Sequence, residues 1–171
     1  MKASTDNVTE PVTQSVITDP ITRLASKDRL ELGHGPVFTL KLGDTTIREE
    51  IPKRAAMAMS TVLNDALVKH PRSSIIKLNP AGLDERSVRI LIDFINGNSK
   101  TNKPFSIRVS ETLRELVNLY RHACMLGMDH NAGGLRHKIL EHVNGNFSVS
   151  FSALDEIAQL PVTDSCWRTA V

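Results

Sequence analysis

The spacing of apolar residues changes near Pro52 from every second position to every third or fourth, and this change limits what the chain can fold into. From Phe38 to Leu42, apolar residues alternate with polar ones, which places the apolar set on one face of a β-strand. Gly43-Asp44 supplies a turn, and a return strand over 46–51 carries its own inward apolar residues. The sequence therefore predicts a β-hairpin with one buried face, covered by a helix.

Helical spacing follows the hairpin. Pro52 suits a first helical position, because its missing N–H would be unpaired there anyway. Apolar residues then recur at intervals of three and four as far as His70-Pro71, which predicts a single helix over 52–70. The β-rich run 74–78 is predicted to join the hairpin as a third strand, and Asp84 to cap a helix that ends at Asn96-Gly97.

The second half of the chain predicts a further pair of helices. A polar surface loop is expected over 98–104, and then a short strand or an extended arm over 105–109. Ser110 is placed to cap a helix that ends at Gly127, where a left-handed residue is wanted. Another helix opens close behind this glycine and closes at Gly145, and the two helices are expected to lie antiparallel.

These elements divide the chain of 171 residues into three parts. Residues 1–34 are a flexible, Ser/Thr-rich lead with one short helix predicted over 24–32. Residues 35–145 form a single α+β domain, in which a small three-stranded sheet is capped by a cluster of helices. Residues 146–171 form a C-terminal helical extension, with short helices expected over 150–160 and 164–171.

Composition disfavours several classes of protein. Hydrophobic residues make up 40%, and no apolar run approaches the roughly 20 residues that cross a bilayer, so we expect a soluble protein without a membrane partner. The start of the chain carries no secretory signal, which favours an intracellular setting, cytoplasmic or nuclear. Cys124 and Cys166 are too far apart in sequence to suggest a disulfide framework or a zinc site. The net charge of +2 gives no reason to expect nucleic-acid binding.

Several local sequences match one known family in the same order. The hairpin leads into Ile51-Pro52-Lys53, and Ser60-Thr61-Val62-Leu63 is similar to a Ser-x-Val-Phe run in that family's first core helix. The run 75–78 matches its third strand, and 93–97 matches the turn that ends its next helix. Over Val37 to Val143 the chain resembles the BTB/POZ domain, whose fold is shared with Skp-type cullin adaptors and elongin C.

The resemblance extends to one subgroup and departs from another. The segments 120–128 and 161–168 are similar to those of BTB-like proteins of filamentous fungi. Dimeric BTB domains of transcription factors carry an Asp early in the first strand and a His before the first helix. This chain has Val37 or Phe38 and Pro52 at those places, which argues against obligate dimerisation through the pocket those residues build.

Cullin-binding members of the family carry a hydrophobic-x-Glu motif where a helix follows the long loop. Two stretches fit it here, Val109-Ser110-Glu111 and Leu113-Arg114-Glu115. The resemblance therefore implies Val109, Glu111, Leu113 and Glu115 as partner-binding residues. The simpler interpretation of Leu113 is a core residue of the helix.

Clusters of reactive side chains have structural explanations. His137 and His142 share one helix with Glu141, but the five-residue step between the histidines turns them to different faces, so no metal site is predicted. Cys124 follows His122 closely but lies on an apolar stripe, which favours a core residue over a nucleophile. We therefore expect no catalytic residue, no cofactor and no small-molecule substrate.

The sequence thus predicts a non-enzymatic protein–protein interaction module, an adaptor or scaffold. The resemblance implies either a substrate receptor of a cullin ubiquitin ligase or a self-associating regulator. The alternative is a helical nucleic-acid-binding or transcription-regulatory protein, because the helices around Gly127 resemble a helix-turn-helix with Arg136, His137 and Lys138 as its basic cluster.

Overall fold

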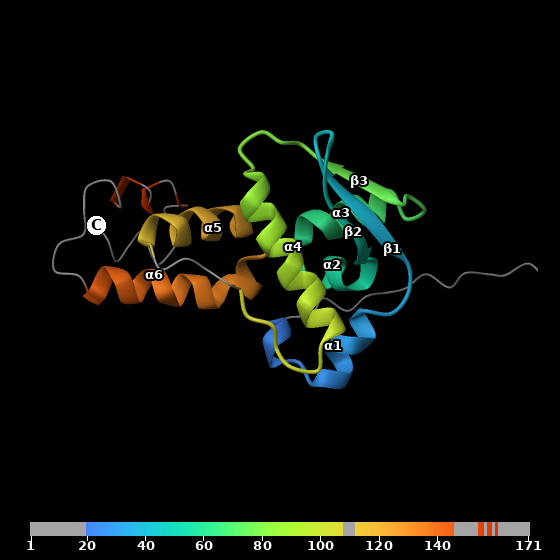
Figure 1. The fold of residues 1–171 in the computed structure, drawn as a ribbon, viewed down its shortest axis with the longest axis horizontal. Coiled ribbons are helices and arrows are strands. Elements are labelled where there is room, and N and C mark those ends of the chain that lie inside the picture. The colour runs from blue at the N-terminus through green and yellow to red at the C-terminus, as the bar shows by residue number, and fades with distance from the viewer. Residues whose placement is uncertain (1–19, 108–111, 146–153, 156, 159, 161–171) are drawn as a thin grey trace, which may run out of the picture.

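The computed structural model describes residues 20–107, 112–145, 154–155, 157–158 and 160. Its architecture is mixed α and β, with a small sheet on one side of a helical cluster and two helices that project away from the sheet (Figure 1). In chain order the elements are η1 (Ile21–Arg23), α1 (Ser26–Leu32), β1 (Val37–Leu42), β2 (Thr45–Pro52), α2 (Lys53–Met59), α3 (Thr61–Lys69), β3 (Ile75–Leu78), α4 (Glu85–Lys100), α5 (Leu113–Met125), η2 (Asp129–Ala132) and α6 (Gly133–Gly145).

The sheet has β1 at its centre, with β2 antiparallel on one side and β3 parallel on the other. The predicted hairpin and the predicted third strand are both confirmed. Phe38 pairs with Ile51, whereas Leu40 pairs with Arg48, so β2 holds one residue more than β1 over this stretch. Glu50 adopts a positive φ of 53° within this bulge, which bends β2.

One face of the sheet is buried and the other is exposed. Phe38, Leu40 and Leu42 on β1, with Ile47 and Ile51 on β2, are at most 7% exposed. Helices α2 and α4 pack against β2 on this side and α3 packs against α2, so the inward residues join one continuous hydrophobic core. The alternation seen in the sequence therefore predicted the correct buried set.

The single helix predicted over 52–70 is in fact two helices. Pro52 ends β2, and Ser60 separates α2 from α3 in an extended conformation (φ −139°, ψ 119°). The Ser60 hydroxyl accepts a hydrogen bond from the Leu63 N–H at 3.1 Å and donates one to the Leu126 carbonyl at 2.6 Å. The prediction was wrong because the apolar spacing continues across the break. The break itself is produced by the Ser60 side-chain cap and by its hydrogen bond to a distant carbonyl, which the spacing does not record.

We expect Ser60→Ala to lower the free energy of unfolding by about 1–2 kcal/mol, because it removes the cap of α3 and one hydrogen bond to the Leu126 carbonyl. Chemical denaturation at constant slope measures the change. Ser74→Ala, at an exposed serine, is the matched control and is expected to change stability by less than about 0.5 kcal/mol. Equal losses in the two variants would contradict the capping role.

Helix α4 runs one turn beyond its predicted end at Asn96-Gly97, because the residues there lie on its buried side. The Asn98 amide donates to the carbonyls of Phe94 at 3.0 Å and Phe105 at 2.9 Å, and its oxygen accepts from the Phe105 N–H at 3.0 Å. A Cβ at Gly97 would overlap the ring of Phe105. The loop predicted from residue 98 therefore starts at Thr101, and Phe105 begins an extended arm held on α4, not a strand.

Helices α5 and α6 run side by side in opposite directions, as predicted (Figure 1). Gly127 follows α5 with a φ of +62°, the left-handed conformation expected for it. The Thr61 N–H donates to the Gly127 carbonyl at 3.1 Å, so the turn between the two helices is fastened to the start of α3. Together with Ser60 and Leu126, these residues form the joint between the helical pair and the rest of the fold.

Helix α1 begins at Ser26, close to the predicted start, and is tied to the loop after α4 by a buried arginine. Arg29 is 2% exposed, and its guanidinium donates to the carbonyls of Leu24 at 2.8 Å and Asn102 at 2.6 Å.

Near the C-terminus, Ile157 is buried as expected and the Ala158 N–H bonds the Leu154 carbonyl at 2.8 Å.

The remaining predictions concern parts of the chain outside the described residues. They are the flexible lead over 1–19, most of the C-terminal extension, and the helix over 164–171 with Trp167. The cap predicted at Ser110 was wrong, because α5 begins at Leu113 and its N-cap residue is Thr112.

Candidate interaction surfaces

The predicted partner-binding residues gather at the start of α5, as far as they are described. Leu113 is half-buried and packs against the core, which agrees with its simpler interpretation. The Glu115 carboxylate lies 3.5 Å from the Arg86 guanidinium of α4 and accepts a hydrogen bond from the Thr112 hydroxyl at 3.0 Å. Val109 and Glu111 lie outside the described residues.

A buried histidine joins α5 to the start of α4. His122 is 1% exposed, and its Nε2 accepts a hydrogen bond from the Asp84 N–H at 2.9 Å. Its Nδ1 lies 2.6 Å from the Asn118 carbonyl oxygen, so Nδ1 carries the proton and the ring is the neutral tautomer. Both ring nitrogens of His122 therefore take part in hydrogen bonds that hold the fold. Cys124 packs half-buried against the core, as the apolar stripe predicted.

Asp84 caps α4 as predicted, accepting a hydrogen bond from the Ser87 N–H at 2.8 Å. Burial raises the pKa of its carboxyl, but hydrogen bonds from the Ser87 N–H, the Ser87 hydroxyl and the Arg86 N–H outweigh burial and lower the pKa from 3.8. The protein is therefore expected to lose stability as the pH falls below 3.8 through the lowered folded pKa, since the unfolded chain binds this proton first.

Urea denaturation at several pH values between about 4 and 2 tests this. Asp84→Asn keeps an oxygen that can cap the helix but does not titrate. The variant is therefore expected to lose less stability over this range than the unchanged protein. Parallel pH profiles for the two proteins would contradict the assignment.

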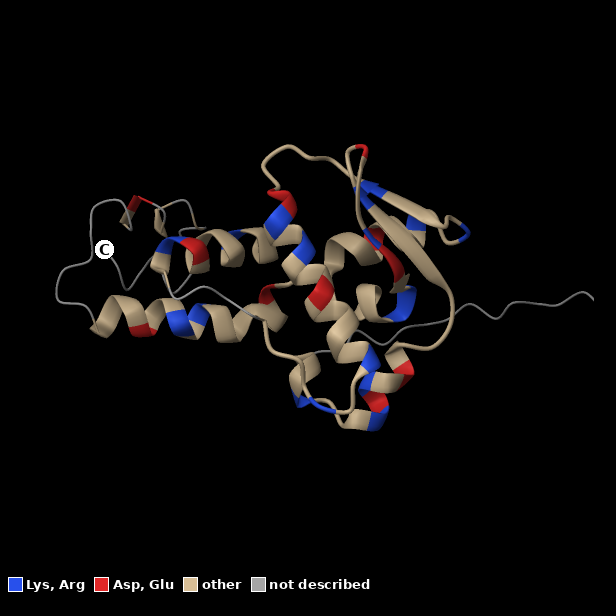
Figure 2. Cartoon of the chain, viewed as in Figure 1, with Lys and Arg blue, Asp and Glu red and all other residues tan. Residues whose placement is uncertain are grey.

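The outer face of the sheet is a second exposed surface. Val37 on β1 and Ile75 on β3 are 46% and 45% exposed, although both are β-branched and apolar. Lys41 and Lys77 are register partners on the same two strands, so two lysine side chains leave this face from neighbouring positions. In Figure 2 the cationic positions of the sheet lie near the turn of the hairpin, with an acidic residue at the turn itself. The sequence showed which residues of β1 point outward, but not that β3 would pair with it in this register.

The free edge of β3 is poorly suited to pair with another strand. The Ser73 hydroxyl donates to the Ile75 carbonyl at 2.5 Å and accepts from the Ile75 N–H at 3.2 Å, so it occupies both backbone groups there. The strand is only four residues long and carries Lys77. These are devices that protect sheet edges from strand addition.

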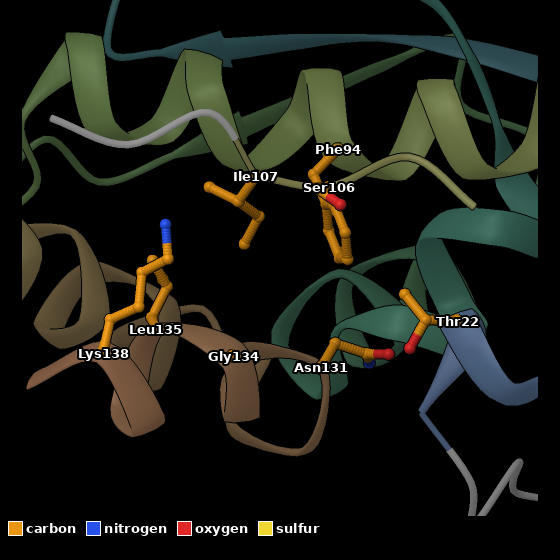
Figure 3. Close-up of a pocket in the computed structure, with 8 residues that line it drawn as sticks. All are labelled: Thr22, Phe94, Ser106, Ile107, Asn131, Gly134, Leu135 and Lys138. Atoms are coloured by element: carbon orange, nitrogen blue, oxygen red, sulfur yellow. The ribbon is translucent and has the colours of Figure 1, made fainter. Parts of the chain in front are cut away.

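A pocket of about 300 Å³ lies between α4, the arm after it, η1 and α6. Figure 3 shows Lys138 and Ile107 facing each other at one end, with Asn131 and Thr22 at the other. The Asn131 amide oxygen accepts from the Ile21 N–H at 2.9 Å, so it serves the fold. Arg136 and His137 share α6 with Lys138, but His137 lies 3.3 Å from Glu141 and Lys138 borders the pocket. The basic cluster of the helix-turn-helix alternative is thus divided between two environments.

Among the described residues, no three metal-ligating side chains come together. Within the same ranges, no helix combines the length and the apolar character that crossing a membrane requires. Comparison with protein-family models, with curated proteins and with solved structures found no match for the chain.

Proposed function

We propose that the chain is a protein–protein interaction module of the BTB/POZ type, and that it serves as an adaptor for a cullin scaffold. The observation that carries the proposal is the arrangement of the elements. β3 lies parallel to β1 and is reached through α2 and α3, and the next helix, α4, packs on β2. This packing supports the proposal, because it arranges the strands and helices in the order on which the resemblance rests.

The start of α5 supports the cullin role over simple self-association. Arg86 and Thr112 hold the Glu115 side chain at the surface, and Leu113 nearby is half-buried against the core. The motif therefore presents an exposed carboxylate next to an anchored apolar residue. The pair Leu113 and Glu115 matches the hydrophobic-x-Glu motif with the glutamate side chain 44% exposed. Val37 and Pro52 stand where dimeric members carry charged or titratable residues.

Calorimetric titration of the full chain with a cullin N-terminal domain tests the proposal. We expect Glu115→Gln to weaken the affinity by about tenfold, because it removes the charge that the motif presents. Glu141→Gln, an exposed glutamate on α6, is the matched control and is expected to change the affinity by less than about twofold. Equal effects of the two variants, or the lack of any binding by the unchanged protein, would contradict the cullin role.

A further inference from the structure

We propose that the outer face of β1 and β3 binds an extended acidic segment of a partner protein. The inference rests on the proposed function, since it names the kind of segment by which an adaptor would hold the protein that it brings to the cullin scaffold. The occupant is a stretch of about six residues with apolar, β-branched side chains followed by carboxylates at one end.

The first support is the pair of lysines. Lys41 and Lys77 are register partners on the two parallel strands, and like charges at opposite positions of a sheet are destabilising. The Asp44 carboxylate lies 3.3 Å from the Lys77 ammonium, but its side chain is fully exposed, so this ion pair is weak. A partner's carboxylates would relieve this repulsion.

The second support is the apolar part of the face. Thr39 and Ile75 are paired two residues before the lysines, and Val37 continues the outward row of β1. The apolar patch is therefore followed by the two lysines at one end, over about 13 Å of strand from Val37 to Lys41.

The third support concerns where a partner can lie. Ser73 blocks the backbone groups of Ile75 at the free edge of β3, so an incoming segment rests on the side chains of the face and does not extend the sheet. Lys53 holds the loop before β3 by donating to the carbonyls of Pro71 at 2.7 Å and Ser73 at 2.8 Å. The acidic residues Glu49 and Glu50 belong to β2 at the opposite edge, which directs an acidic segment toward β1 and β3.

The test uses the full chain and a fluorescein-labelled synthetic peptide with the sequence Thr-Val-Thr-Val-Glu-Glu, whose binding is measured by fluorescence anisotropy at low ionic strength. We expect saturable binding that the double variant Lys41→Gln with Lys77→Gln weakens by about tenfold or more. Lys27→Gln with Lys103→Gln removes the same charge from exposed lysines elsewhere and is expected to change the affinity by less than about twofold. Ile75→Ser is expected to weaken binding by about threefold or more, which attraction by charge alone would not produce.

Equal weakening by the two double variants would reduce the effect to net charge and overturn the inference, as would the lack of binding by the unchanged protein. Binding that Ile75→Ser leaves unchanged would also overturn it. The cullin titration is independent of this face, so the double variant Lys41→Gln with Lys77→Gln is expected to bind the cullin domain normally. Failure of the proposed function and failure of this inference are therefore separate results.

Discussion

Replacing Gly127 with alanine is expected to lower the free energy of unfolding by about 3 kcal/mol. The residue adopts a φ of +62°, which costs an L-residue about 1–2 kcal/mol. A Cβ at this position would also overlap the Thr61 hydroxyl and come within 3.2 Å of the Thr61 backbone nitrogen. Thr61 is the residue whose N–H bonds Gly127, so the substitution strains the joint that fastens α5 and α6 to α3.

Denaturation of three further variants checks this explanation. Gly134→Ala is the matched control, because a Cβ on that helical glycine meets nothing within 4 Å, and its stability is expected to be unchanged or raised by up to about 1 kcal/mol. Gly127→Ala is expected to cost at least about 1 kcal/mol less when it is introduced into the Thr61→Ala variant than when it is introduced into the unchanged protein. Additive effects would show that the overlap with Thr61 is not the cause.

Asn98→Leu is expected to lower the free energy of unfolding by a similar amount, about 3 kcal/mol. Asn98 is fully buried, and its amide makes three hydrogen bonds, two of them with the backbone of Phe105. Leucine has nearly the same shape but cannot bond, so it leaves the N–H and the carbonyl of Phe105 without these partners. The arm after α4 should then exchange its amide hydrogens faster than the rest of the domain.

Asn96 provides a control within the same helix. It is 5% exposed, and in the described part of the chain neither its amide nitrogen nor its oxygen has a hydrogen-bond partner. Asn96→Leu therefore removes two buried polar atoms that bond nothing, and stability is expected to change by less than about 1 kcal/mol in either direction. Equal losses at Asn96 and Asn98 would mean that packing, not hydrogen bonding, decides the cost.

Predictions made from short-range patterns agree best with the structure. The alternation from Phe38 to Leu42 predicted both the strand and its buried face, because successive residues of a strand point to opposite sides. Gly127 was placed correctly, because few other residues accept its backbone conformation. The register that sets Lys41 beside Lys77 depends on how β3 docks, which no local pattern records.

The helix boundaries that were missed depend on contacts between distant residues. The break at Ser60 is held by the Leu126 carbonyl, 66 residues away, and the last turn of α4 is held by Phe105 through Asn98. Glycine and asparagine ordinarily mark a helix end, but here Gly97 lies against the ring of Phe105 and the Asn98 amide bonds the carbonyls of Phe94 and Phe105, so both stay in the helix. For the candidate site, the resemblance implied Leu113 and Glu115 as partner-binding residues, but the sequence could not show that Arg86 lies beside the glutamate.

The most direct test of the account is the mass in solution of the full chain, measured by light scattering during size-exclusion chromatography, alone and mixed with a cullin N-terminal domain. A BTB-type cullin adaptor is expected to shift into an earlier peak whose mass equals the sum of the two proteins. Separate elution of the two, with the chain either as a single copy or as a stable dimer, would contradict the account.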